Sequence, residues 1–258
     1  MPEELVSVQD EGPARRIHLD SPANRNALSE ALLDQLTAAL TAAAKASAVR
    51  VVILGHTGSV FCSGADLKEQ LEARRERGAS PGAGALVPVL RLIRALPQPV
   101  IAEVRGAVRG GGMGLVAESD IVVATSAATF AFSEVKVGVA PAVIAVPVLA
   151  KMPLSRALEL FLTGRTFDAV EASAAGLVNH VVDPEEVAER TGMLVHELAG
   201  GAPSAQREIR RLVREVPALD EEAAYQAMVE LSRRLFSSPE GAEGMAAFRE
   251  RRRPDWGR

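Results

Sequence analysis

The chain has 258 residues, 48% of them hydrophobic, and a formal net charge of −4, so it is long enough to bury a large core in one or two domains. The slightly acidic balance gives no electrostatic reason to expect nucleic acid as a partner. The single cysteine, Cys62, excludes an intrachain disulfide and fits a reducing compartment. Because the sequence shows no signal-peptide pattern and no run of about 18 apolar residues, we expect a cytoplasmic protein without a membrane partner.

Two kinds of apolar pattern predict the strands. An alternating pattern predicts a strand pair near the N-terminus, over 5–9 and 15–20. Mainly apolar runs predict three buried strands, over 49–55, 99–104 and 120–125. Helical patterns alternate with these strands, so the sequence predicts an α/β core.

The predicted helices begin with an amphipathic segment over 28–46, with Ser29 as its N-cap. A stretch rich in glycine and charge, 75–85, predicts a surface loop. From about residue 184 onward the pattern predicts one helix after another. The basic runs RRLVR (210–214) and RERRR (249–253) are interpreted as solvated helix faces, with one local anionic ligand as the alternative.

Two turns of small residues are expected near the ends of buried strands. In AVRGGGMGL (107–115) three glycines run into an apolar, helix-forming stretch, and SVFCSGADLKE (59–69) follows the strand over 49–55. Bare backbone N–H groups at such turns bind a polarised oxygen. If the two turns face each other, one N–H from each stabilises a carbonyl that becomes an enolate or a tetrahedral oxyanion.

Four signatures in a fixed order identify a resemblance. They are FCSGADLKE, PVIAEVRGAVRGGGMGL followed by SDIVVA, FAFSEVKVGVAP, and LTGRTFDAVEASAAGLVNHVV. The chain resembles the enoyl-CoA hydratase/isomerase (crotonase) superfamily over essentially its whole length. The resemblance implies an α/β fold, a crotonase-like spiral of ββα units with a helical C-terminal trimerisation region. It implies an acyl-CoA-binding core over 1–195, an oligomerising helical region over 196–258, and a homotrimer or homohexamer.

The resemblance also implies the catalytic groups. The oxyanion hole falls on the backbone N–H groups of Ala65 and Gly111, and one of two family glutamates is present as Glu134. The other glutamate maps onto Gly114 and is therefore absent. Glu118 lies four residues further along the same predicted helix and so on the same face, where it either leans toward the pocket or serves packing or a salt bridge.

A second departure from the family pattern lies at 137–149, where the family often has a glycine-rich stretch after the proline. The residues Ala142, Val143, Ile144 and Ala145 stand there instead. They either put bulk near the acyl pocket or pack only beneath the helix.

Coenzyme A is expected as part of the substrate, with no permanently bound cofactor and no metal site. The resemblance implies that the following residues contact it: Arg25, Ala27, Leu28, Ser63, Asp66, Lys68, Phe248 and Arg251. The four histidines lack metal-ligand spacing. Cys62, within the second turn, is interpreted as a small buried residue rather than a nucleophile.

The sequence therefore favours an enoyl-CoA hydratase that adds water across a 2,3 double bond by way of an enolate, with Glu134 as the single general acid/base. One alternative is a 3,2-enoyl-CoA isomerase, because moving a proton between C4 and C2 also needs one carboxylate and an enolate hole. The other is a member that binds acyl-CoA without turnover.

Overall fold

The large sheet forms the centre of the protein in the computed structural model, which describes residues 3–78 and 83–256. Its strand order is β1-β2-β3-β5-β7-β10, antiparallel between β1 and β2 and parallel elsewhere. The strands are β1 Val6–Glu11, β2 Ala14–Leu19, β3 Val51–His56, β5 Val100–Val104, β7 Ile121–Thr125 and β10 His180–Val182. The five strands expected from the apolar patterns are confirmed to within about two residues at each end.

A second, smaller sheet has the order β4-β6-β8-β9. Its strands are β4 Val60–Cys62, β6 Ala107–Arg109, β8 Thr129–Ala131 and β9 Phe167–Asp168. After each of β3, β5 and β7 in the large sheet, the chain enters the next strand of the small sheet and then continues into helices. This repeated path is the predicted spiral of ββα units, and the predicted fold class is confirmed.

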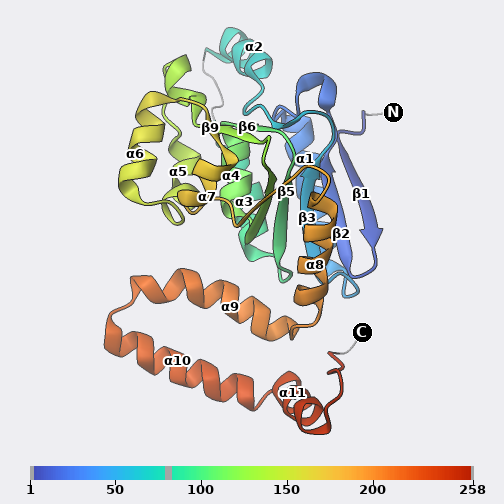
Figure 1. Ribbon diagram of the computed structural model, residues 1–258. Helices are drawn as coiled ribbons and strands as arrows, with labels where there is room; N and C mark the ends of the chain where they lie inside the picture. The colour runs from blue at the N-terminus through green and yellow to red at the C-terminus, as the bar shows by residue number, and fades with distance from the viewer. Residues whose placement is uncertain (1–2, 79–82, 257–258) are drawn as a thin grey trace.

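Helices cover both faces of the large sheet (Figure 1). The first five are α1 Glu30–Lys45, α2 Leu67–Arg77, α3 Leu86–Ala95, α4 Gly111–Glu118 and α5 Ala142–Leu149. Ser29 caps α1, as predicted, because its Oγ accepts a hydrogen bond from the Leu32 N–H at 3.2 Å. The apolar face of α1 packs with one side of β3, and α8 (Val187–Ala199) packs with the other side.

The remaining elements complete the chain. They are the helices α6 Leu154–Thr163, α7 Ala169–Ala174, α9 Pro203–Glu215, α10 Glu221–Phe236 and α11 Pro239–Glu250, and the 3-10 turns η1 Pro22–Asn24, η2 Ser133–Val137 and η3 Val216–Ala218. The surface loop expected over 75–85 is helical at its start, because α2 continues to Arg77, and residues 79–82 of that prediction lie outside the described residues.

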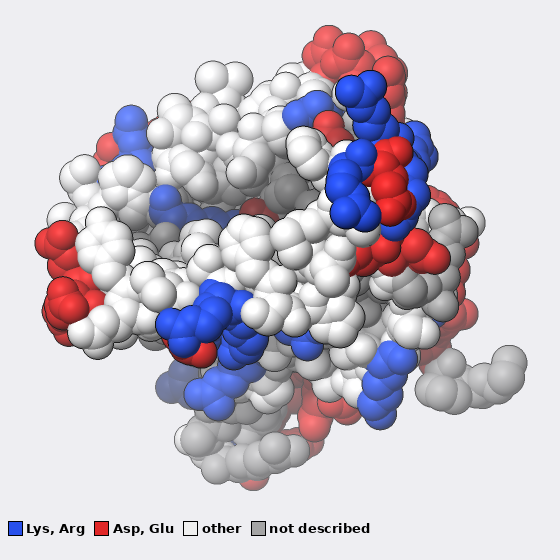
Figure 2. Space-filling model, turned by 90° about the horizontal axis from the view of Figure 1, so that it is seen from below, with Lys and Arg blue, Asp and Glu red and all other residues white. Residues whose placement is uncertain are grey.

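Helices α9, α10 and α11 form an arm that extends below the core (Figure 1). Seen from below, much of this face is uncharged, with charged groups gathered in separate patches and a hollow near the middle (Figure 2). Large apolar side chains stand in solvent along the arm, among them Tyr225, Val229 and Phe236. Within the described part of the chain, no helix combines the length and the apolar character needed to cross a membrane.

Candidate active site

The two glycine-containing turns face each other at the ends of β4 and β6. Gly64 has a φ of +99°, and a Cβ placed on it would lie 3.4 Å from Gly110 Cα and 3.7 Å from Gly111 N. The Leu28 N–H donates to the Gly64 carbonyl at 2.8 Å, which ties the first turn to the segment before α1. Ala65 follows Gly64 and Gly111 follows Gly110, so the two predicted oxyanion-hole residues belong to turns in direct contact.

Helix α4 begins where the two turns meet, and its first two residues, Gly111 and Gly112, have no room for a side chain. A Cβ on Gly111 would lie 2.6 Å from Leu28 Cδ1, and a Cβ on Gly112 would lie 2.6 Å from Cys62 Cβ. The glycines therefore let the backbone of α4 approach β4 and the Leu28 segment closely. The partial positive charge of the helix N-terminus lies at the same place and favours an anionic oxygen there.

Glu134 brings a carboxylate to the turns from η2. Its Oε1 lies 3.8 Å from the position of a Cβ on Gly110. Its Oε2 is buried and has no hydrogen-bond partner among the residues that the structure describes. Burial raises the pKa of the Glu134 carboxyl, while a hydrogen bond from its own backbone N–H opposes the rise. A partly desolvated carboxylate with a free oxygen is suited to accept and return a proton.

The space beside Gly114 is filled by Ile144 from α5. A Cβ on Gly114 would lie 2.7 Å from Ile144 Cγ2, 3.3 Å from Ile144 Cβ and 3.5 Å from Leu90 Cδ2. The two departures from the family pattern, the glycine at 114 and the aliphatic residues after Pro141, are therefore linked. The Ile144 side chain fills the space that a side chain at position 114 would take. Among the described residues, and apart from its chain neighbours and the nearby backbone of its own helix, the three heavy atoms nearest to this position are all aliphatic carbons, and none belongs to a carboxylate.

Comparisons with known proteins identify the family of this chain. A family model described as enoyl-CoA hydratase/isomerase matches residues 12–258. The chain belongs to this family. It is similar to a putative enoyl-CoA hydratase of Thermus thermophilus, at 32% identity over 97% of this chain and 99% of the relative. It is also similar to enoyl-CoA hydratase EchA19 of Mycobacterium tuberculosis, at 31% identity over 96% and 95% of the two chains.

Solved structures share the whole fold. The crystal structure of human enoyl coenzyme A hydratase domain-containing protein 3 has a TM-score of 0.91 and 30% identity, and the match covers 98% of this chain and 100% of that one. An enoyl-CoA hydratase from Mycobacterium smegmatis has a TM-score of 0.88 and 32% identity, over 98% and 99% of the chains. The crotonase fold of this enoyl-CoA hydratase/isomerase family member therefore extends to its C-terminal helices.

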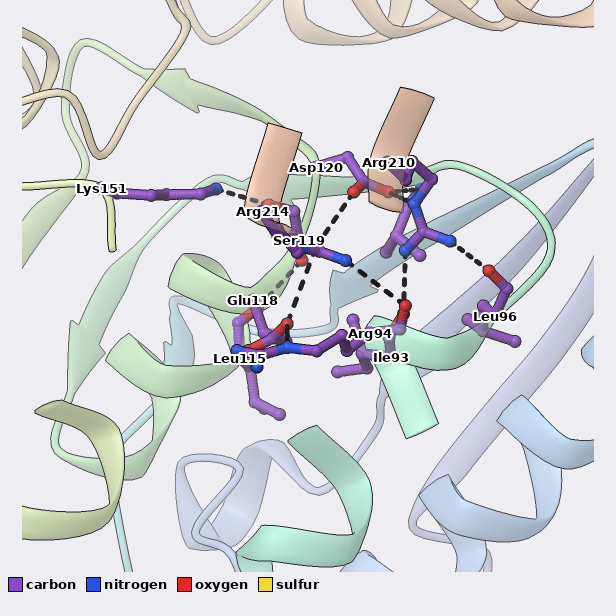
Figure 3. Close-up of polar contacts among 11 residues, drawn as sticks. Ile93, Arg94, Leu96, Leu115, Glu118, Ser119, Asp120, Lys151, Arg210 and Arg214 are labelled. Atoms are coloured by element: carbon purple, nitrogen blue, oxygen red, sulfur yellow. Dashed lines mark hydrogen bonds and ion pairs between the residues drawn. The ribbon is translucent and has the colours of Figure 1, made fainter. Parts of the chain in front are cut away.

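Glu118, the last residue of α4, lies at the opposite end of this helix from the glycine turns and is paired with Arg94 (Figure 3). Its side chain is 3% exposed and accepts two hydrogen bonds from Arg94, at 2.8 and 2.9 Å. Arg214 of α9 lies 3.7 Å from Glu118 Oε1. The salt-bridge interpretation of Glu118 is confirmed, and the alternative in which it leans toward the pocket is wrong.

The same cluster fastens the C-terminal arm to the end of α4 (Figure 3). Asp120 forms ion pairs with Arg210 at 2.7 Å and with Arg214 at 3.3 Å. Lys151 donates from Nζ to the Ser119 carbonyl, and burial lowers the Lys151 pKa to about 8. The interpretation of RRLVR as a solvated face is therefore wrong for Arg210 and Arg214. Their carboxylate partners lie about ninety residues earlier, so no local pattern in the sequence pointed to them.

The predicted coenzyme A segment before α1 is rigidly connected to the first turn. Arg25 is exposed, has a φ of 52°, and accepts a hydrogen bond at its carbonyl from the Ser63 N–H at 3.1 Å. Ala27 and Leu28 are buried behind it. Asn26, which sequence reasoning missed, is fully buried and donates to the Thr57 and Val60 carbonyls at 3.1 and 2.8 Å. This asparagine holds the segment against β4.

Asp66 and Lys68 stand at the start of α2. The Asp66 carboxylate caps the helix by accepting from the Lys68 N–H at 2.9 Å, and it also accepts from Asn24 Nδ2 at 2.7 Å. These hydrogen bonds lower the Asp66 pKa against the opposing effect of its burial. The Lys68 side chain is exposed beside them. The Asp66 carboxylate thus has a clear structural role in positioning the turn that carries Ala65.

Phe248 and Arg251 are not brought to the glycine turns within this chain. Both belong to the end of α11, which lies at the bottom of the molecule in Figure 1, whereas α2 lies at the top. Phe248 is 87% exposed. Their contact with coenzyme A stays a prediction of the family resemblance.

Cys62 lies behind the first turn and is fully buried. Its Sγ accepts a hydrogen bond from the Gly64 N–H at 3.4 Å, and burial raises the pKa of the thiol to about 12. The structure confirms the interpretation of Cys62 as a small buried residue. Over residues 3–78 and 83–256, no group of three or more potential metal ligands comes together.

Proposed function

We propose that this family member is an enoyl-CoA hydratase that uses Glu134 as its single general acid/base. The observation that carries the proposal is the Glu134 carboxylate beside the paired glycine turns, whose buried Oε2 has no hydrogen-bond partner in the described part of the chain. The names of the relatives support a reaction on coenzyme A thioesters. Coenzyme A enters with the substrate in this proposal, and the acyl-CoA thioester is the binding partner.

In the proposed reaction, the thioester oxygen accepts hydrogen bonds from the Ala65 and Gly111 N–H groups. Glu134 removes a proton from water as the water oxygen bonds to C3, and the electron pair of the double bond moves toward the thioester to give an enolate. The two N–H groups and the N-terminus of α4 stabilise the negative oxygen. Glu134 then returns the proton to C2, which completes the addition of water and restores the carboxylate.

A specific observation favours isomerisation as a second candidate. The place of the family's other glutamate is occupied by the aliphatic side chain of Ile144, and Glu118 is held by Arg94. Glu134 alone must therefore orient the attacking water, whereas moving a proton from C4 to C2 of a 3-enoyl thioester needs no water. A member that binds acyl-CoA without turnover is the remaining alternative.

The test compares the purified protein on crotonyl-CoA and on a 3-enoyl-CoA. We expect hydration of crotonyl-CoA, and we expect Glu134→Gln to lower turnover about 100-fold or more with nearly unchanged affinity for the thioester. Double-bond migration without hydration supports the isomerase. Binding without either reaction supports the non-catalytic alternative.

A further inference from the structure

Two crossing turns, which carry the chain from the large sheet to the small sheet, touch each other. The first, 57–59, joins β3 to β4, and the second, 105–106, joins β5 to β6. A Cβ on Gly106 would lie 2.1 Å from the Ser59 carbonyl oxygen, and the Ala107 N–H donates to that oxygen at 3.4 Å. The start of β6 is therefore held directly against the start of β4.

His56, the last residue of β3, joins the first crossing turn to the second. It is buried, and its ring packs edge-on against Phe61 of β4, with 5.4 Å between the ring centroids. The Arg105 N–H donates to His56 Nε2 at 3.1 Å. Because a backbone N–H can only donate, Nε2 carries no proton, and the neutral ring keeps its proton on Nδ1, which faces the Thr57 carbonyl at 3.3 Å.

The surroundings of His56 favour this neutral ring. Burial lowers the His56 pKa, while the hydrogen bond with the Thr57 carbonyl opposes the shift. Among the titratable neighbours, His18 on β2 and Arg105 lower the pKa further, and Glu103 on β5 raises it. The neutral form is the one that can accept from the Arg105 N–H.

The first crossing turn is fixed independently of His56. The buried Asn26 side chain donates to the Thr57 carbonyl at 3.1 Å and to the Val60 carbonyl at 2.8 Å. His56 therefore holds the Arg105 N–H from a turn that is itself fastened to the segment before α1.

The crossing turns and the glycine turns lie at opposite ends of the same two strands. Strands β4 and β6 pair in parallel and have three residues each, which span roughly 10 Å. Ala65 follows the first strand and Gly111 follows the second. Two N–H groups reach one oxygen only if both lie within hydrogen-bond distance of it, so a shift of about 1 Å between the strands is enough to misplace one of them.

We infer that His56 is a positioning residue for the proposed oxyanion hole. By accepting from the Arg105 N–H, it fixes β6 relative to β4 and so sets the spacing of the Ala65 and Gly111 N–H groups. This inference rests on the placement of the thioester oxygen in the proposed function, but it does not depend on which reaction follows, because hydration and isomerisation both pass through an enolate.

The test uses butyryl-CoA, a saturated thioester that the protein cannot hydrate. Infrared difference spectra with and without a carbon-13 label isolate its carbonyl band, whose frequency falls when the oxygen accepts hydrogen bonds. In the wild type we expect the bound band below that of the free thioester in water. His56→Phe keeps a ring against Phe61 and removes the acceptor, so the band should move to higher frequency, and turnover of crotonyl-CoA should fall about 10- to 100-fold. His56→Gln, whose amide oxygen can accept from the Arg105 N–H, should restore most of both.

His18→Gln is the matched control. His18 is a half-buried histidine whose ring packs against Gly55, next to His56, and in the described part of the chain no hydrogen bond joins its side chain to the second crossing turn. It should leave the carbonyl band unchanged, which a general loosening of this region would not. His56→Leu, which also removes the acceptor, is the second variant should His56→Phe not fold.

An unchanged band in folded His56→Phe or His56→Leu, an equal shift in His18→Gln, or a His56→Gln protein that restores nothing overturns the inference. A wild type that does not bind butyryl-CoA, or leaves its carbonyl band as in water, overturns it together with the oxyanion hole. A wild type that lowers the carbonyl frequency through His56 yet transforms no enoyl-CoA contradicts the proposed function and leaves the role of His56 intact.

Discussion

Glu118 and Arg94 face each other at the end of α4 and are joined by two parallel hydrogen bonds of 2.8 and 2.9 Å. Glu118 is the only carboxylate on α4, and its ion pair with Arg94 leaves Glu134 as the glutamate for proton transfer. It also links α4 to α3, and through Arg214 to the arm.

Glu118→Gln should lower stability and leave turnover nearly unchanged. The amide removes the negative charge that faces Arg94 and Arg214, and the loss is about 1–3 kcal/mol, since Arg94 is half-exposed. Chemical denaturation measures the loss, and initial rates on crotonyl-CoA should stay within about threefold. Glu230→Gln, in an exposed pair with Arg233, is the control and should cost about 0.5 kcal/mol or less. A Glu118→Gln protein that is folded but inactive contradicts the assignment of Glu134.

Glu134→Gln should make the protein more stable near neutral pH. Burial raises the folded-state pKa of Glu134 above its ordinary value of 4.5, so ionisation is harder in the folded than in the unfolded chain. The resulting destabilisation is absent below 4.5, grows as the pH rises to the folded-state pKa, and is complete above it. Unfolding free energies of both proteins at about pH 4 and about pH 8 measure it. A difference that is the same at both pH values contradicts the raised pKa.

Enzyme activity should depend on the same ionisation of Glu134 and be lost at acidic pH. The unprotonated Glu134 is the base for water addition, so kcat/KM should fall as the pH drops through a pKa above 4.5. The pH profile of the wild type is the measurement. An acid limb centred at or below that value contradicts the expected titration.

Gly114→Ala should destabilise the protein although alanine favours helices. The added Cβ would lie 2.7 Å from Ile144 Cγ2, and such overpacking costs about 1–3 kcal/mol. Ile144→Ala removes the overlap, so a double-mutant cycle should show a coupling of about 0.5–3 kcal/mol. Gly192→Ala in α8 is the control: among the described residues, and apart from its chain neighbours and the nearby backbone of its own helix, no heavy atom lies within 4 Å of its Cβ position, and it should stabilise by about 0.5–1 kcal/mol. If the stability effects of the two substitutions simply add, the Ile144 side chain does not fill the space beside Gly114.

The protein should assemble into a trimer or hexamer. Leu154, Leu158 and Leu162 recur every four residues on α6 with exposures of 59–71%, and α10 exposes Tyr225 and Phe236. Apolar surface of this extent is typical of subunit interfaces. Light scattering at micromolar concentration should give the mass of a trimer or hexamer, and Leu158→Glu should reduce it. A monomeric wild type contradicts the prediction.

The large sheet and the small sheet differ in how well the sequence predicts them. The strand expected over 49–55 is Val51–His56, because a buried parallel strand is a nearly continuous apolar run. Strands such as β4 and β6 have three residues, which is too short for any periodicity to be visible. Only the family resemblance implied their arrangement.

The site shows a similar division. Glycines mark the turns that carry Ala65 and Gly111, since close backbone approach requires them locally. The pairing of Gly114 with Ile144 and that of Glu118 with Arg214 join residues about 30 and about 96 positions apart. Such contacts depend on how α5 and α9 pack on α4, and tertiary packing of this kind leaves no mark in a local pattern.

The burial of Cys62 means that labelling of its thiol can measure local opening of the structure around it. Its thiol is the single one in the sequence, has no exposed surface, and has a pKa of about 12. A thiol reagent can therefore react only while the turn over Cys62 is transiently open, and the labelling rate reports the free energy of that opening. Because Cys62 lies directly behind Gly64 and Gly112, a bound thioester that braces these turns should slow labelling in proportion to its occupancy.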